Sequence, residues 1–224
     1  MSSIVQTTKE QRIGYITLNR PQKRNALNAV MVSELKEALN RWKDNHSVRA
    51  IILNAKGKAF SAGADLAYLQ ALQANSYEEN LADSNHLKEL YLTLDTYPKP
   101  VIAQVEGHAI AGGCGLATVC DFVFAVPEAK FGYTEVRIGF VPALVLTFLL
   151  RKVSYSVAND LLLTGRLIEA NEAQSKGLIY QVVPKEEIAE KVQVFASNLI
   201  KKTSGQAIAT TKALMQKVKT LTTE

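Results

Sequence analysis

The sequence is poor in the residues that build metal centres and disulfide frameworks. Its 224 residues include two cysteines, three histidines and one tryptophan. Histidine and cysteine are too sparse for a zinc cluster, so no metal site is predicted. Cys114 and Cys120 fall on one predicted helix, about 240° apart around its axis, which argues against an intrahelical disulfide. The sequence therefore predicts a reduced, cytoplasmic protein.

Long hydrophobic runs are also absent. No uninterrupted apolar stretch reaches the ~20 residues that a membrane-spanning helix requires. Residues 1–6 lack a charged segment followed by an apolar one. We therefore expect neither a membrane partner nor a secretory signal.

Charge is ordinary in amount and scattered in position. The formal net charge is +5, with 47% hydrophobic and 21% charged residues, which fits a soluble globular chain of one large domain or two small ones. No nucleic-acid partner is expected, because the basic residues are neither clustered nor interleaved with aromatic ones. We interpret them as a solvated surface, with one alternative: a basic patch at residues 22–25 that binds a phosphorylated small molecule.

Short strands alternate with helices through the first two thirds of the chain, and helices dominate after Pro142. Asn28 is the expected N-cap of the first long helix, and residues 9–12 are expected to close a hairpin. This order predicts an α/β fold with parallel strands. The predicted strands cover residues 4–8, 13–18, 48–54, 101–105, 122–125 and 178–183, with a short extended piece at 130–133. The predicted helices cover residues 27–44, 66–72, 79–97, 112–120, 143–152, 157–164, 169–175, 186–201 and 205–221.

Two small-residue turns follow predicted strands and lead into predicted helices. Residues 59–66 follow the strand that contains Leu53, and residues 108–118 follow the strand that ends at Val105. Glycine-rich turns of this kind let a ligand approach the backbone closely and aim free N–H groups at it. Such a turn binds a phosphate or stabilises an oxyanion, and the two turns together can supply one N–H each to a single oxygen.

Short sequence motifs in a fixed order resemble the crotonase (enoyl-CoA hydratase/isomerase) superfamily across nearly the whole chain. Each motif alone is weak evidence for the family, whereas the ordered set is specific. The matching motifs are residues 18–21, 25–28, 60–66, 111–114, 120–121, 131–135, 162–165, 170–173, 177–178 and 182–184.

The resemblance implies a spiral of ββα turns in residues 1–141 that binds acyl-CoA. It implies a mainly helical part in residues 142–224 that drives assembly of a homotrimer, often into a hexamer. Related chains continue beyond this point, so the helical part is expected to be incomplete at its end. The implied substrate is an acyl-CoA thioester, and no cofactor is implied beyond the coenzyme A that forms part of that substrate.

The resemblance also implies roles for individual residues. The thioester oxygen would accept hydrogen bonds from the N–H groups of Ala64 and Gly112, and donors of this kind lower a comparable acyl-transfer barrier by ~3–4 kcal/mol each. Contacts with coenzyme A are implied at Lys23, Arg24, Ala26, Ala62, Asp65 and Leu66. The acyl chain is expected to contact Leu69, Tyr133, Phe140 and Leu144.

The acid–base residues decide which reaction is expected. Hydratases of this family use two glutamates; the first position is Gly115 here, and the second is Glu135. The context of Glu135 is expected to bury its carboxyl in part and raise its pKa, the alternative being a surface glutamate paired with Arg137. One carboxylate suffices to move a double bond, so isomerisation of a 3-enoyl-CoA to a 2-enoyl-CoA is the favoured reaction. Dienoyl-CoA isomerases carry a further aspartate at a position that is Ala143 here.

Other functions stay open from the sequence alone. Hydration of a 2-enoyl-CoA, including a branched, methylglutaconyl-like one, requires another side chain, such as Asp83 or Tyr68, to hold the water. Decarboxylation of a malonyl-type thioester passes through a similar enolate, and a non-catalytic acyl-CoA-binding protein would keep only the fold. His108 is expected to be a framework residue. Cys114 lies at a helix N-terminus, which lowers a thiol pKa, but packing is its expected role.

Overall fold

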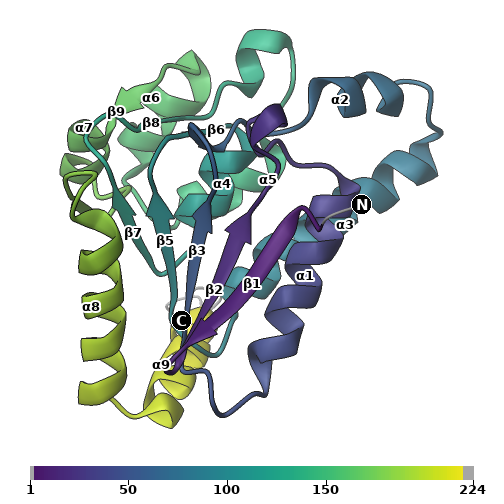
Figure 1. Ribbon diagram of the computed structural model, residues 1–224. Helices are drawn as coiled ribbons and strands as arrows, with labels where there is room; N and C mark the ends of the chain where they lie inside the picture. The colour runs from purple at the N-terminus through teal and green to yellow at the C-terminus, as the bar shows by residue number, and fades with distance from the viewer. Residues whose placement is uncertain (1–2, 219–224) are drawn as a thin grey trace.

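The chain folds into two sheets with helices around them (Figure 1). The computed structural model describes residues 3–218, apart from the side chain of Leu66. The larger sheet has the strand order β1-β2-β3-β5-β7-β10. The first two strands form the predicted antiparallel hairpin, and the other neighbours run parallel, which confirms the α/β class. These strands are β1 (Val5–Glu10), β2 (Ile13–Leu18), β3 (Ala50–Ala55), β5 (Val101–Val105), β7 (Phe122–Ala125) and β10 (Gln181–Val182).

The smaller sheet, ordered β4-β6-β8-β9, consists of short strands of which the sequence predicts only β8. Strands of two or three residues carry too little alternation to be recognised from their sequence. β4 pairs with β6 in parallel, so the segments that follow these two strands lie side by side. The strands are β4 (Ala59–Ser61), β6 (His108–Ile110), β8 (Lys130–Gly132) and β9 (Ile168–Glu169).

The helices occupy the predicted regions, and two short 3₁₀ helices are added. The 3₁₀ helices are η1 (Pro21–Lys23) and η2 (Glu135–Ile138). The α-helices are α1 (Ala29–Lys43), α2 (Leu66–Leu72), α3 (Tyr77–Asp95), α4 (Gly112–Thr118), α5 (Ala143–Leu149), α6 (Tyr155–Thr164), α7 (Ala170–Ser175), α8 (Ile188–Lys202) and α9 (Gly205–Val218). The last three residues of the predicted helix 205–221 lie outside the described residues.

Local hydrogen bonds set the ends of several elements. α1 begins at the predicted cap, because the Asn28 side chain accepts a hydrogen bond of 3.0 Å from the Met31 N–H. α3 begins two residues before its predicted start because Ser76 and Glu79 cap each other's backbone N–H groups. β10 is shorter than the predicted strand 178–183, since the N–H groups of Leu178 and Ile179 donate to the Ala173 carbonyl instead of a neighbouring strand.

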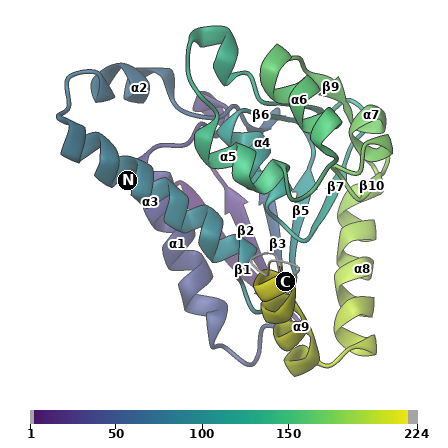
Figure 2. The same ribbon diagram turned by 180° about the vertical axis from the view of Figure 1, so that it is seen from behind.

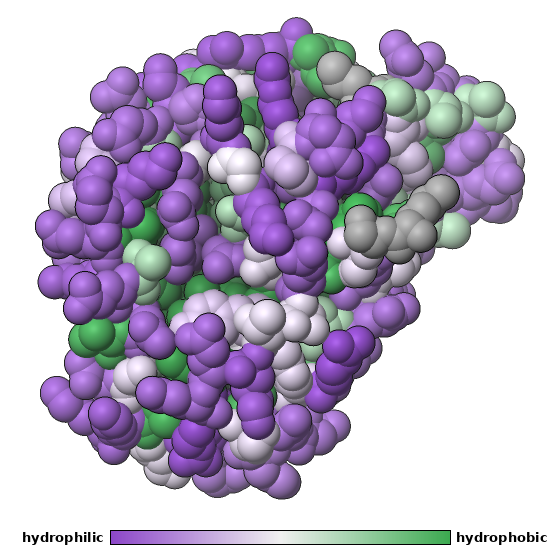
Figure 3. All heavy atoms as spheres, in the orientation of Figure 1, coloured by the Kyte–Doolittle hydropathy of each residue, from purple (hydrophilic) through white to green (hydrophobic). Residues whose placement is uncertain are grey.

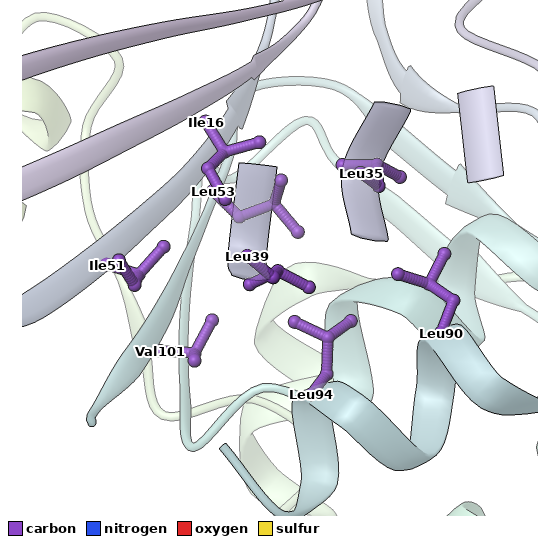
Figure 4. Close-up of a pocket in the computed structure, with 8 residues that line it drawn as sticks. All are labelled: Ile16, Leu35, Leu39, Ile51, Leu53, Leu90, Leu94 and Val101. Atoms are coloured by element: carbon purple, nitrogen blue, oxygen red, sulfur yellow. The ribbon is translucent and has the colours of Figure 1, made fainter. Parts of the chain in front are cut away.

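The main core lies between the larger sheet and helices α1 and α3, which run side by side in Figure 2. Figure 4 shows the aliphatic side chains that fill this layer and point toward one another. They are Ile16, Leu35, Leu39, Ile51, Leu53, Leu90, Leu94 and Val101. All are buried and apolar, so the space between them is core packing.

Hydrophilic side chains cover most of the face shown in Figure 3. Within residues 3–218, no helix has both the length and the hydrophobicity needed to cross a bilayer.

Candidate active site

A cavity of about 910 Å³ lies between the loop after β2, the two small-residue turns, helices α2 and α3, and the segment from Thr134 to Val145. Its lining is mostly apolar, with a few polar and charged groups. The cavity therefore brings together residues that are far apart in the sequence. The predicted site residues that line it are Lys23, Arg24, Ala26, Ala62, Ala64, Asp65, Leu69, Gly112, Glu135, Phe140 and Leu144.

The two small-residue turns meet at the base of α4. Gly63 has a φ of +87°, and a Cβ built on it would lie 2.9 Å from the Ala111 Cβ and 3.5 Å from the Gly112 nitrogen. Only glycine combines this backbone conformation with so close an approach. The turn that carries Ala64 is thus held against the turn that carries Gly112.

Both turns present an unpaired backbone N–H group. The Leu27 N–H donates to the Gly63 carbonyl and the Asp65 N–H donates to the Leu27 carbonyl; these bonds flank Ala64. Within the described residues no backbone acceptor pairs with the Ala64 N–H. Gly112 is the first residue of α4, where a helix leaves its N–H groups without an internal partner. Two backbone donors are therefore available in the cavity, as an oxyanion-binding site requires.

Because Gly113 has no side chain, the two turns can pack closely against each other. A Cβ at this position would lie 2.6 Å from the Ser61 Cβ and would also collide with the Ser61 carbonyl oxygen. Ser61 itself is fully buried and its hydroxyl accepts a hydrogen bond from the Gly63 N–H. A side chain at Gly113 would push β4 away from α4 and separate the two donors.

Glu135 begins η2 and lines the cavity. Its side-chain Oε2 is buried and has no hydrogen-bond partner among the described residues. Burial raises the pKa of the Glu135 carboxyl above its ordinary value. No ion pair joins it to Arg137 within residues 3–218, so the predicted raised pKa is confirmed and the surface pair is not formed. A half-desolvated carboxyl without a partner is suited to accept and return a proton.

Gly115 is buried in α4 and faces Val145 of α5. A Cβ on Gly115 would collide with the Val145 Cγ1 and would lie 3.4 Å from the Tyr91 hydroxyl oxygen. A glutamate side chain therefore has no room at Gly115 unless Val145 moves.

Tyr91, on α3, also approaches Gly115. Its hydroxyl donates a hydrogen bond of 2.8 Å to the Gly112 carbonyl, and its ring lies 5.7 Å from that of Phe148 between centroids. Burial, together with the negative charge of Glu135, raises the pKa of Tyr91, which keeps the hydroxyl protonated. Tyr91 is not recognised from the sequence, although its spacing from Asp83 and Leu87 places all three on one face of α3.

The loop after β2 carries the basic residues. Asn25 is fully buried and holds this loop, since its amide nitrogen donates to the carbonyls of Lys56 and Ala59. The Ala62 N–H donates to the Arg24 carbonyl at 3.0 Å, which ties the loop to the first small-residue turn. Lys23 and Arg24 thus line the cavity on a fixed backbone.

The Asp65 carboxylate has structural partners. It accepts a 2.7 Å hydrogen bond from Arg20 and a 3.0 Å hydrogen bond from the Ala67 N–H at the start of α2. The hydrogen bond from Arg20 lowers the pKa of Asp65. Because Asp65 follows Ala64 directly, this ion pair also steadies the first backbone donor.

Of the residues expected to contact the acyl chain, Leu69, Phe140 and Leu144 line the cavity, whereas Tyr133 does not. Tyr133 is fully buried, and its hydroxyl lies 2.9 Å from the Thr118 hydroxyl behind α4. The predicted contact through the Leu66 side chain lies outside the described residues. The lining side chains that the sequence did not indicate include His86 and Tyr91.

Two further residues from the sequence stand apart from the cavity. Cys114 is fully buried, and this burial raises the pKa of its thiol to about 12, so desolvation outweighs the lowering expected at a helix N-terminus. The exposed His108 accepts a hydrogen bond of 3.2 Å at Nδ1 from the Lys130 N–H. Both have the packing or framework position that the sequence indicated. Within residues 3–218, no three metal-ligating side chains come together.

Comparison with known proteins adds sequence relatives. Residues 8–224 match the sequence family described as enoyl-CoA hydratase/isomerase. Over 189 residues the chain is 46% identical to a Thermus thermophilus protein provisionally named an enoyl-CoA hydratase, covering 84% of this chain and 75% of the relative. Over 196 residues it is 38% identical to a crotonyl-CoA hydratase of Syntrophomonas wolfei, covering 87% and 74%.

Solved structures agree with the sequence relatives. An enoyl-CoA hydratase of Mycobacterium smegmatis matches with a TM-score of 0.91 and 31% identity over 98% of this chain and 85% of that one. A Legionella pneumophila protein, provisionally named an enoyl-CoA hydratase/isomerase, matches with a TM-score of 0.92 and 33% identity over 100% and 86%.

Proposed function

This chain belongs to the enoyl-CoA hydratase/isomerase family and has its crotonase-like core, and from that premise we propose that it isomerises 3-enoyl-CoA thioesters to 2-enoyl-CoA thioesters. The observation that carries this proposal is the Glu135 carboxyl, which lines the cavity with a buried oxygen that has no partner in the described part of the chain. The same cavity holds the free N–H groups of Ala64 and Gly112.

The proposed reaction moves one proton and one double bond. The thioester oxygen accepts hydrogen bonds from the Ala64 and Gly112 N–H groups, and the Glu135 carboxylate removes a proton from C2. The electron pair of the broken C–H bond enters the conjugated system, and negative charge collects on the thioester oxygen as a dienolate. Protonated Glu135 then returns the proton at C4, which leaves a double bond between C2 and C3. Backbone donors aimed at the developing charge stabilise it without reorganisation.

The nucleotide end of coenzyme A is proposed to bind at the loop after β2. Lys23 and Arg24 supply positive charge for its phosphates, and Ala26 and Ala62 supply small surfaces for the adenine. These four residues line the cavity beside the first backbone donor. Asp65 supports this loop through Arg20 and is proposed to act there rather than on coenzyme A itself.

Hydration of a 2-enoyl-CoA is the second candidate. It is favoured by the relative named crotonyl-CoA hydratase. Water attack at C3 needs groups that orient the water as well as a base. Because Gly115 has no side chain and no room for one, such groups would have to come from elsewhere in the cavity, where the hydrogen-bonded pair Tyr68 and Asp83 is one source on α2 and α3.

A homotrimer or hexamer is proposed as the assembled form. Several apolar side chains are exposed around η2, α5 and α6, where a second copy would cover them. They are Ile138, Val141, Leu150, Tyr155 and Leu163. Light scattering on the protein as it elutes from a size-exclusion column is expected to give a mass three or six times that of one chain. A mass of one chain would contradict this assembly.

The test of the reaction is incubation of the purified protein with 3-hexenoyl-CoA, followed by ultraviolet absorbance and mass spectrometry. Isomerisation gives a conjugated product of unchanged mass. A product heavier by one water would establish hydration, and an unchanged substrate would contradict the proposal. Glu135→Gln, run beside the parent protein, separates catalysis at this site from a contaminating activity.

A further inference from the structure

The wall that α2 and α3 give to the cavity contains a hydrogen-bonded polar pair, in addition to the lining residues Ser84, His86 and Tyr91. The Tyr68 hydroxyl of α2 donates a hydrogen bond to Oδ1 of Asp83 on α3. Both residues line the cavity and both are half-buried. Their lining neighbours on the two helices include Leu69, Leu72 and Leu87. A charged carboxylate is costly in such surroundings unless it has a use or a partner.

The hydrogen bond gives the two members of the pair different roles, with Tyr68 as donor and Asp83 as acceptor. Burial and the adjoining Asp83 carboxylate raise the pKa of Tyr68, so Tyr68 stays a neutral donor. The hydroxyl donates to Oδ1 of Asp83 and so holds the Asp83 side chain in place. The pair presents a carboxyl group, steadied by one donor, to the cavity.

The cationic groups of the cavity lie elsewhere. Among the described lining residues, lysine and arginine occur only at Lys23 and Arg24, on the loop proposed to bind phosphates. His86 is a basic lining side chain on α3, and its ring nitrogens lie 3.0 Å from the Ser33 hydroxyl and 3.2 Å from the Lys36 ammonium. No cation from these groups forms an ion pair with Asp83 or Glu135 within residues 3–218. Among the described lining residues, the part of the cavity between α2, α3 and η2 therefore holds the carboxyl groups of Asp83 and Glu135 and no lysine or arginine.

We propose that the Tyr68–Asp83 pair determines acyl specificity and that it rejects acyl chains with a terminal carboxylate in favour of uncharged chains. This inference rests on the proposed acyl-CoA function of the cavity. Two like charges in a partly desolvated space repel each other more strongly than in water. Acyl groups such as glutaconyl or methylglutaconyl carry a carboxylate toward Asp83, on a wall where the described lining residues include no lysine or arginine. Uncharged acyl chains have no charge for Asp83 to repel.

Binding of two matched thioesters tests this specificity without any turnover. Pentanoyl-CoA and glutaryl-CoA have the same five-carbon chain and differ in whether the last carbon is a methyl group or a carboxylate. Neither has a double bond to move or hydrate. Titration calorimetry on the full chain is expected to give a Kd for glutaryl-CoA that is at least about tenfold weaker than for pentanoyl-CoA, as one unfavourable charge pair predicts.

Two variants assign the discrimination to Asp83. Asp83→Asn keeps the size of the side chain and an acceptor for the Tyr68 hydroxyl, and it is expected to bring the two Kd values within about threefold of each other. Glu78→Gln removes the same charge from an exposed position in the first turn of α3, away from the cavity, and is expected to leave the ratio unchanged.

Each outcome has a definite meaning. Equal binding of the two thioesters by the parent chain overturns the proposal without reference to any variant, as does an unchanged ratio in a folded Asp83→Asn protein. Failure of the parent chain to bind either thioester would instead remove the proposed acyl-CoA function, and this inference with it. Circular dichroism of each variant identifies a loss of fold.

Discussion

The two sides of the cavity are built in different ways. On the turn side, the segments around Ser61 and Gly113 approach so closely that a single added Cβ would collide with backbone. On the wall side, residues 138–141 and the helices α2 and α3 present side chains, and Val141 is 76% exposed. The turn side fixes where charge can be stabilised, because its donors belong to the backbone. The wall side, with Glu135 at the start of η2, supplies the proposed proton carrier and the proposed acyl contacts, which belong to side chains and can change without moving the donors.

The largest effect is expected from a wall-side change that leaves the turns intact. Glu135→Gln removes the proposed proton carrier, and kcat is expected to fall by about 10³-fold, within the usual range for loss of a general acid–base group. Burial raises the pKa of Glu135, so the carboxyl favours the folded state while protonated and disfavours it once pH exceeds that pKa. The amide variant should therefore be at least as stable as the parent at neutral pH, as thermal unfolding would show.

The pH dependence of the parent enzyme follows from the same shift. Glu135 must be ionised to remove the C2 proton, so kcat/KM should fall as pH decreases through its raised pKa. The acid limb of the profile should lie above the ordinary glutamate range of about 4.3. An acid limb at or below that value would contradict Glu135 as the base, as would an active Glu135→Gln protein.

A turn-side change is expected to reduce stability and activity together. Gly113→Ala places a methyl group against Ser61, and overpacking of this kind costs about 1–3 kcal/mol of unfolding free energy. The displacement also separates the Ala64 and Gly112 donors, so kcat should decrease in the protein that remains folded. Gly177→Ala is a control for lost stability alone: a Cβ there meets nothing within 4 Å but is strained by a φ of +74°, and Gly177 does not line the cavity, so kcat should be unchanged. Equal activity in Gly113→Ala and the parent would show that the turns tolerate movement.

The smallest effect is expected where the two sides touch. Tyr91→Phe removes the hydrogen bond to the Gly112 carbonyl, and Tyr97→Phe removes a similar 2.7 Å bond to the Leu39 carbonyl, far from the cavity lining. Each loss should cost about 0.5–1.5 kcal/mol of stability. Only Tyr91→Phe should lower kcat, by several-fold and with little change in KM, because Gly112 is the proposed donor to the transition state. Equal kcat losses in both variants would make Tyr91 merely a stability residue.

The same division explains what could be predicted from sequence. The turn side can be recognised from short sequence motifs, since the close approach of the two turns requires glycine at positions 63 and 113. The sequence therefore predicts that Ala64 and Gly112 lie together, and their turns do meet. The capping box at Ser76 and Glu79 is also visible in the sequence, although the predicted start of α3 missed it.

The wall side was less predictable because it depends on which face of an element meets the cavity. Tyr133 follows β8 and turns toward the Thr118 hydroxyl, whereas Tyr91 arrives from α3, an element distant in the sequence. Single-sequence patterns give the face of a helix but not the partner that this face meets. The short strands β4 and β6, which align the two turns, carry too few residues for any pattern.

The close approach of Val145 to Gly115 also constrains which substitutions these two positions can accept during evolution. A glutamate introduced at Gly115 meets Val145, so that substitution alone is penalised before it can confer new chemistry. Shortening Val145 first leaves a small void of the kind that cores tolerate at modest cost, and the acidic residue can then enter. The cost of an acidic residue at position 115 therefore depends on the side chain at position 145, and the shorter side chain at 145 makes room for a second glutamate in the site.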